Sequence, residues 1–189
     1  RLTEGQHRQR QSHVAGILEH HRRQEGIVRD AEQARHRPGQ QAGTEHHAGG
    51  TEQQRQRFLV PGIRGEKIAA LGITEPGTGS DVASIKTFAK KDGDDYVITG
   101  TKMWITSGTQ SDWICLLANT SEGAPHKNKS LIIVPLNLPG VTRHKIHKLG
   151  MHSSDTAQLF FDEVRVPKTH LIGGEGMGFF MQMLQFQEE

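Results

Sequence analysis

Several kinds of residue are scarce in this chain of 189 residues. It has a single cysteine, Cys115, which excludes an intrachain disulfide framework. Because Cys115 stands in the apolar run 113–118, we expect a buried and unreactive thiol. No aromatic residue precedes Phe58 and no lysine precedes Lys67, although 11 of the 13 arginines do. The material for a hydrophobic core is therefore concentrated beyond this point.

Long apolar runs and a strong net charge are absent as well. No run approaches the ~20 apolar residues that a membrane-spanning helix needs. The formal net charge of +2 is too small to predict nucleic acid or an anionic membrane as a partner. The chain opens at Arg1 without a methionine and has no signal-peptide pattern. We therefore expect a piece of a longer protein from a reducing compartment, neither membrane-spanning nor secreted.

Residues 1–49 are rich in Arg, Gln, His, Glu and Gly and have little to bury. This composition predicts disorder or marginal helix. A basic arm for nucleic acid is disfavoured by the interspersed acids, and the His20–His21 and His46–His47 pairs are poorly spaced for one metal ion. The switch from arginine to lysine usage favours a third explanation, a different reading frame or an unrelated spliced segment.

The remaining chain reads as strands between two short helical pieces. Residues 50–59 predict a short polar helix capped by Thr51, which Pro61–Gly62 then breaks. Short apolar or alternating segments with turn residues between them predict a mainly β domain over 68–172, an antiparallel β-barrel or sandwich with a partial helix at each side. The expected strands span 68–73, 84–90, 96–99, 103–106, 113–118, 131–134, 141–147 and 157–166.

A glycine-rich stretch, residues 173–178, ends this β region. Residues 179–187 then follow helical spacing, so a helix is expected to begin there. The glycines could cradle a phosphate at the helix N-terminus. A flexible connection to a further helical domain is the interpretation that we favour.

Two segments have the composition of a ligand site. Residues 73–81, Ile-Thr-Glu-Pro-Gly-Thr-Gly-Ser-Asp, form a turn in which Gly77 and Gly79 permit positive φ and close approach of a ligand. Their neighbours supply hydroxyls and backbone amides. In residues 103–108, Met-Trp-Ile-Thr-Ser-Gly, Trp104 and Thr106 would project from one side of a strand. A planar ring with polar edges would fit between the two segments.

The two segments, in this order and spacing, resemble the flavin-binding signature pair of the acyl-CoA dehydrogenases. The resemblance runs from about residue 50 to the last residue, and residues 1–49 do not share it. It implies the middle β-domain of the family over 68–172, a remnant of the N-terminal helical domain over 50–67, and the start of the C-terminal helical domain over 173–189. FAD is the cofactor that it implies.

The resemblance also assigns roles to individual residues. Thr106 would bond near the flavin N5, Trp104 would pack against the ring, and Ser80 would lie where flavin and acyl-CoA meet. The cofactor contacts implied are Leu71, Ile73, Thr74, Gly79, Ser80, Trp104 and Thr106. The substrate contacts implied are Ser80, Phe186 and Gln187, although Gln187 replaces an acid found in some members. The catalytic glutamate of the family would lie beyond Glu189, so the chain by itself is expected to be inactive.

The implied function is α,β-dehydrogenation of acyl-CoA thioesters, with the β-hydride passing to FAD. Implied partners are an acyl-CoA substrate, an electron-transfer flavoprotein or similar acceptor, and further copies of the protein in a homo-oligomer. The family is often mitochondrial, and a cytoplasmic location is the other expectation. The alternative left open is a non-enzymatic interaction or regulatory module, or a truncated splice product.

Titratable residues outside these assignments favour ordinary structural roles. Glu75 and Asp81 stand beside Pro and Gly in a tight turn, where carboxylates usually hydrogen-bond backbone amides and hold the loop. His144 and His147 would point to opposite faces of a strand, so with His152 they predict surface residues and no metal site.

Overall fold

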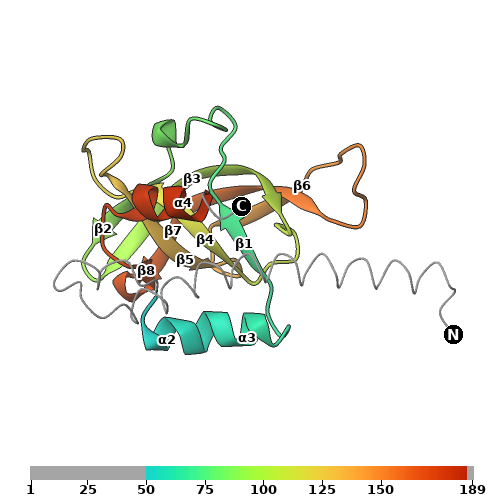
Figure 1. The fold of residues 1–189 in the computed structure, drawn as a ribbon, viewed down its shortest axis with the longest axis horizontal. Coiled ribbons are helices and arrows are strands. Elements are labelled where there is room, and N and C mark those ends of the chain that lie inside the picture. The colour runs from blue at the N-terminus through green and yellow to red at the C-terminus, as the bar shows by residue number, and fades with distance from the viewer. Residues whose placement is uncertain (1–49, 187–189) are drawn as a thin grey trace, which may run out of the picture.

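A computed structural model describes residues 50–186, and the expectations for residues 1–49 and Gln187 lie outside the described part. A helical segment, a β-sheet and a second helix follow one another along the chain (Figure 1). The helical elements are α2 (Glu52–Gln54), the π-turn η2 (Arg55–Leu59), α3 (Val60–Ile63), the short turns η3 (Val82–Ser84) and η4 (Lys168–His170), and α4 (Gly178–Phe186). The strands are β1 (Ala69–Gly72), β2 (Phe88–Asp92), β3 (Asp95–Thr106), β4 (Trp113–Asn119), β5 (Lys129–Pro135), β6 (Val141–Lys145), β7 (Thr156–Pro167) and β8 (Leu171–Ile172).

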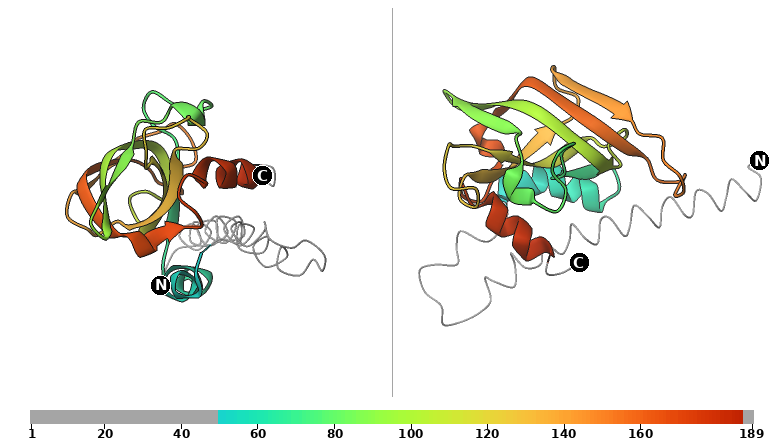
Figure 2. Two further views of the ribbon diagram at one scale, coloured as in Figure 1. Left: turned by 90° about the vertical axis from the view of Figure 1, so that its left-hand side faces the viewer. Right: turned by 90° about the horizontal axis from the view of Figure 1, so that it is seen from above.

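The expected mainly β, largely antiparallel fold is confirmed. The strands form one sheet in the order β6-β7-β3-β2-β4-β5-β8, with β1 added in parallel to β4. Strands β2 and β4 meet only at the pair Phe88–Asn119, so the sheet divides into two halves. The sheet curls over strongly (Figure 2). Its edge strands β6 and β8 do not pair with each other, so it does not close into a barrel. Of the two predicted architectures, the sandwich is the better description.

Strands β4 and β5 bury both of their faces. Ile114 and Leu116 of β4 belong to the main core between the two sheet halves, with Ile132 and Val134 of β5. Alternate residues on the other face belong to a second cluster, in which Leu117 and Leu131 pack with Ile73, Val82, Ile85 and the α4 residues Phe179 and Met181. This double burial explains why both strands are continuous apolar runs and do not alternate with polar residues.

Strand β3 is one 12-residue strand where two short strands were expected. Its pairing with β7 shifts register twice. Between Lys102 and Ile105, two β3 residues oppose one β7 residue, which is a β-bulge. Between Ile98 and Gly100 the extra residue belongs to β7. The bulges let a single strand run from the hairpin turn through both regions that the sequence suggested were separate.

The first helical segment is capped as expected but ends later. The Thr51 hydroxyl accepts from Gln54 N at 3.2 Å, and the Gln54 amide oxygen accepts from Thr51 N at 2.8 Å, so the two form a capping box. The prediction of a break at Pro61–Gly62 is wrong, because α3 continues to Ile63. The π-turn directly before Pro61 widens the backbone, and a wider turn leaves room for a ring that would clash in a regular α-helix.

This helical segment docks on the sheet through Phe58, Gln54 and Arg57. The Phe58 ring packs edge-on against Trp113 and His170, with centroids 5.7 and 5.2 Å apart. Gln54 donates to the carbonyls of Thr169 and Leu171 at 2.6 and 2.8 Å. His170, buried to 4% exposure, faces the Ile133 carbonyl with Nδ1 and Arg57 with Nε2, so Nδ1 carries the proton of the neutral ring.

The glycine-rich connection to α4 is closely packed. A Cβ on Gly178 would lie 2.6 Å from the Ser130 carbonyl carbon, and one on Gly176 would lie 2.5 Å from the Lys127 oxygen. Gly176 N donates to the Ser130 hydroxyl at 2.9 Å. These glycines therefore allow two backbones to touch, which differs from the flexible connection that we expected and also leaves no open phosphate cradle at these two positions.

We expect Gly178→Ala to lower the free energy of unfolding by about 1–3 kcal/mol, although alanine ordinarily favours a helix. The reason is the missing space against the Ser130 backbone. Urea unfolding of the full chain measures the effect. The control is Gly123→Ala, whose Cβ would meet only ordinary contacts at 3.6 Å and should change the free energy by less than about 0.5 kcal/mol. Equal values for the two variants would contradict the close packing.

We also expect docking of the first helical segment to weaken in mild acid. Burial lowers the pKa of His170, against the raising effect of its bond to Ile133, and Arg57 lowers it further. Because the unfolded chain then binds more protons, stability is lost as the pH falls through the ordinary histidine pKa of about 6.5. Between pH 7.5 and 5.5, His170→Gln should lose less stability than the wild type in urea titrations. Parallel losses would show that His170 does not titrate differently on folding.

Candidate functional site

The first signature segment is a tight turn. Glu75 and Thr78 exchange backbone hydrogen bonds of 2.9 and 3.0 Å, with Pro76 and Gly77 exposed at the tip. Neither Gly77 nor Gly79 adopts positive φ, so that part of the expectation is wrong. A Cβ on either residue would meet no atom within 4 Å, so both glycines leave bare backbone facing open space. The two glycines therefore let another molecule come close to the loop backbone, and they do not adopt a left-handed backbone conformation.

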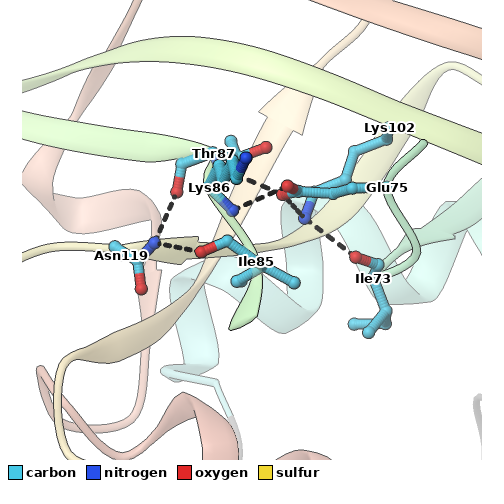
Figure 3. A network of polar contacts seen from close by, with 7 residues as sticks. All are labelled: Ile73, Glu75, Ile85, Lys86, Thr87, Lys102 and Asn119. Atoms are coloured by element: carbon cyan, nitrogen blue, oxygen red, sulfur yellow. Dashed lines mark hydrogen bonds and ion pairs between the residues drawn. The ribbon is translucent and has the colours of Figure 1, made fainter. Parts of the chain in front are cut away.

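A buried ion pair anchors this turn (Figure 3). The Lys102 ammonium group lies 2.9 Å from Glu75 Oε1 and donates a second bond of 2.9 Å to the Ile73 carbonyl. The Glu75 carboxylate also accepts from the backbone amides of Lys86 and Thr87 at 2.6 and 3.0 Å. The side chains of Lys102 and Glu75 are 0% and 6% exposed. One pair of side chains therefore joins both ends of the 73–87 loop to strand β3.

Each charge of this pair favours the ionised form of the other, whereas burial disfavours both ionised forms. Burial pushes the pKa of Glu75 upward, but the Lys102 charge and the hydrogen bonds from Thr87, Lys86 and Lys102 outweigh it, and the pKa lies below its ordinary value. Burial lowers the pKa of Lys102 to about 8, although Glu75 pulls it upward, and the charge of Lys129 lowers it further. Both groups are therefore charged near pH 7.

The second signature segment begins with the β3 bulge. Lys102 and Ile105 point inward, and the extra residue between them turns Trp104 out, with φ of 61° and 57% of its surface exposed. Thr106 is exposed on the same strand. Positive φ is unfavourable for a bulky residue, so the surrounding bonds must hold Trp104 in place. One of them is the bond of 2.8 Å from Met103 N to the Thr74 carbonyl, which brings the two segments side by side.

The turn after Thr106 is held from two directions. The Asp155 carboxylate accepts from Thr109 N at 2.7 Å and from the Gln110 amide at 2.6 Å. Arg143 donates to the carbonyls of Thr109, Ser111 and Leu136 at 3.2, 2.9 and 2.8 Å. These bonds tie the turn to Asp155, directly before β7, and to Arg143 of β6.

Most of the predicted cofactor contacts are solvent-accessible, and the Met103–Thr74 bond joins the two segments that carry them. Gly79, Ser80, Trp104 and Thr106 are exposed, and Thr74 is half-buried. Leu71 and Ile73 differ, because they pack in the second core cluster, and Ile73 is 6% exposed. Phe186 is the last residue of α4, its side chain is outside the described part, and Gln187 lies outside it altogether.

Three residues that position this surface were not predicted: Lys102, Arg143 and Asp155. Regular alternation places Lys102 on the same side as Trp104, and only the bulge reverses it. For Glu75, the expectation that it holds the loop through backbone amides is confirmed. The Asp81 carboxylate bonds instead to the Ser84 hydroxyl.

Other kinds of site find little support among residues 50–186. The described histidines, cysteine and carboxylates include no group of three that could hold a metal ion. No described helix is long and apolar enough to cross a membrane. Burial of the sulfur raises the pKa of the Cys115 thiol to about 12, as expected for an unreactive group. The residue as a whole is half-buried, where the sequence predicted a buried one.

We expect Glu75→Gln and Lys102→Met each to lower the free energy of unfolding at pH 7 by about 3–5 kcal/mol, because each leaves one buried charge unpaired. Lys67→Met is the control. Lys67 pairs with Asp112 at 2.6 Å, but the side chains are 51% and 35% exposed, so its loss should cost less than about 1 kcal/mol. Urea unfolding followed by tryptophan fluorescence measures all three. A buried pair that costs no more than the exposed one would contradict this account.

Comparison with known proteins shows the family to which this chain belongs. The family model "Acyl-CoA dehydrogenase, middle domain" matches residues 70–164. The acyl-CoA dehydrogenase AFT10-1 of Alternaria alternata is 43% identical over 137 residues, which are 72% of this chain and 32% of that protein. The mitochondrial short-chain specific acyl-CoA dehydrogenase of Rattus norvegicus is 39% identical over 135 residues, 71% of this chain and 33% of that protein.

Solved structures agree. The crystal structure of a probable acyl-CoA dehydrogenase from Mycobacterium abscessus superposes with a TM-score of 0.73 at 41% identity, covering 76% of this chain and 38% of that one. The chain thus spans about a third of the length of the curated relatives it matches. With the family model matching half of its residues, the chain belongs to the acyl-CoA dehydrogenase family and carries that family's middle domain.

Proposed function

We propose that the exposed surface formed by Thr74, Gly79, Ser80, Trp104 and Thr106 holds one edge of an FAD isoalloxazine ring in a longer acyl-CoA dehydrogenase. The observation that carries the proposal is the outward, strained placement of Trp104 beside Thr106, bonded to the signature turn through Met103 and Thr74. An exposed indole face suits a flat ring, and hydroxyls suit a ring edge that has both donors and acceptors.

The residues present fit such a ring. The bare backbone at Gly77 and Gly79 gives a ligand access that any Cβ would narrow. Thr106 and Ser80 offer exposed hydroxyls, and the Glu75–Lys102 pair keeps their segments in register from beneath. Groups that are held before a ligand arrives lose little entropy when it binds, so a pre-formed edge supports binding.

The proposed reaction is α,β-dehydrogenation of an acyl-CoA thioester. When bound, FAD would supply the chemistry of accepting a hydride from the substrate β-carbon. The role of this chain is to orient the ring through Trp104 and Thr106 and to meet the thioester near Ser80. We propose that the carboxylate that removes the α-proton belongs to another part of the longer protein, so that this chain alone turns over no acyl-CoA.

The remaining assignments follow from relatives. Mitochondrial relatives such as the short-chain enzyme of rat suggest a mitochondrial location. An electron-transfer flavoprotein or similar acceptor would reoxidise the flavin, and the full-length protein would form a homo-oligomer. Residues 50–67 would then belong to an N-terminal helical domain, and α4 would open a C-terminal one.

Titration of the full chain with FAD, followed by flavin fluorescence, tests the proposal. Trp104→Ala should weaken binding about tenfold, because an aromatic contact of this kind contributes on the order of 1 kcal/mol beyond its buried area. Thr106→Val should weaken it by a similar factor through the loss of a hydroxyl.

The matched control is Trp113→Phe. Trp113 packs against Phe58 on the helix-docking side, 5.7 Å between ring centroids, so its replacement should leave FAD affinity unchanged. If Trp104→Ala and Trp113→Phe bind FAD equally well, the flavin edge is not at Trp104. If the wild-type chain binds no FAD, the proposal gives way to a non-enzymatic interaction module.

A further inference from the structure

Strand β3 and the signature turn are joined at three points in the described part of the chain. The Lys102 ammonium group donates to the Ile73 carbonyl and to Glu75 Oε1, each at 2.9 Å, and Met103 N donates to the Thr74 carbonyl at 2.8 Å. Two of these three bonds therefore depend on a single side chain. The donors, Lys102 and Met103, directly precede Trp104, the residue with the strained backbone.

We propose that Lys102 and Glu75 are positioning residues of the flavin site, which set the spacing and the relative orientation of the 73–81 turn and the Trp104–Thr106 segment. This inference rests on the proposed function. Neither residue touches the ligand, because the two side chains are 0% and 6% exposed beneath the surface. They act through the backbones of Ile73, Thr74 and Met103.

A purely stabilising role does not account for this pair. A buried ion pair can often be replaced by apolar residues of similar volume with little loss of stability, because burial of both charges is costly. Methionine could fill the volume of Lys102, but it has no donor for the Ile73 carbonyl. What the pair provides beyond stability is a fixed distance between two backbones.

The strained backbone of Trp104 depends on the fixed distance between strand β3 and the signature turn. A positive φ at a bulky residue persists only where neighbouring bonds over-determine it. On one side of Trp104 these are the bonds of Lys102 and Met103, and on the other Ser107 N donates to the Asp155 carbonyl at 3.1 Å. Without Lys102, the bulge could relax toward regular β-structure, in which alternation directs residues 102, 104 and 106 to one face, and the indole would no longer point away from the side that residue 102 occupies.

The double variant Glu75→Gln/Lys102→Met separates the two roles. It leaves no buried charge, so its urea midpoint should lie closer to the wild type than that of either single variant. It still lacks the bond to Ile73, so its FAD affinity should stay about tenfold or more below the wild type. A second readout needs no flavin: the Met103 amide should exchange with D2O at least about tenfold faster than in the wild type.

Gln54→Ala is the matched control in the full chain. It also removes two side-chain bonds to backbone carbonyls, those of Thr169 and Leu171, but on the helix-docking side of the sheet, opposite the signature turn in Figure 1. It should lower the urea midpoint while FAD affinity and Met103 exchange stay as in the wild type.

The outcomes distinguish the inference from the proposed function. Wild-type affinity for FAD with unchanged Met103 exchange in the double variant would overturn the inference and leave the proposed function standing. An equal loss of FAD affinity in Gln54→Ala would also overturn it, because the effect would then follow stability alone. A wild-type chain that binds no FAD would overturn both.

Discussion

A buried carboxylate and a buried ammonium group hold the exposed surface of this domain in shape. Glu75 satisfies two backbone amides on the return of its own loop, and Lys102 binds a carbonyl on the outward run as well as Glu75. Burial of either charge alone would be strongly unfavourable, and the opposite charge of the partner residue compensates for it. The 73–87 loop can therefore expose glycines and hydroxyls at its tip, because the buried Glu75–Lys102 pair holds it in shape.

The β-bulge in β3 determines which side chains of this strand point into the core and which point outward. A regular strand would direct Lys102, Trp104 and Thr106 to the same face, which would either expose the ammonium group or bury the indole. One extra residue between Lys102 and Ile105 lets both of these point inward while Trp104 and Thr106 point outward. The anchor and the exposed ring contact can thus stand two residues apart on one strand, at the cost of positive φ at Trp104.

These two features mark the limit of what the sequence could predict. The strands, the hairpin at residues 92–95, the Thr51 cap and the signature pair follow from local patterns that the structure preserves. The bulge and Lys102 do not, because each depends on a partner distant in the chain. The helix that passes through Pro61 depends on the π-turn before it, which no local pattern in the sequence indicated. Lys102 pairs with a residue 27 positions earlier, and nothing local distinguishes it from a surface lysine. Ile73 shows the reverse case, because it lies within the signature segment and its side chain packs in the core.

The position of Ile73 connects the site to the rest of the fold. Ile73, Val82 and Ile85 come from the signature loop, and they share one cluster with Leu117 and Leu131 of the sheet and Phe179 and Met181 of α4. Because these side chains leave water together, the packing of α4 on the outer face of β4 and β5 also stabilises the loop. The close contact of Gly178 with Ser130 sets how deeply α4 sits on that face. The proposed flavin edge is therefore a property of the packed sheet and helix together, and the motif residues alone do not specify it.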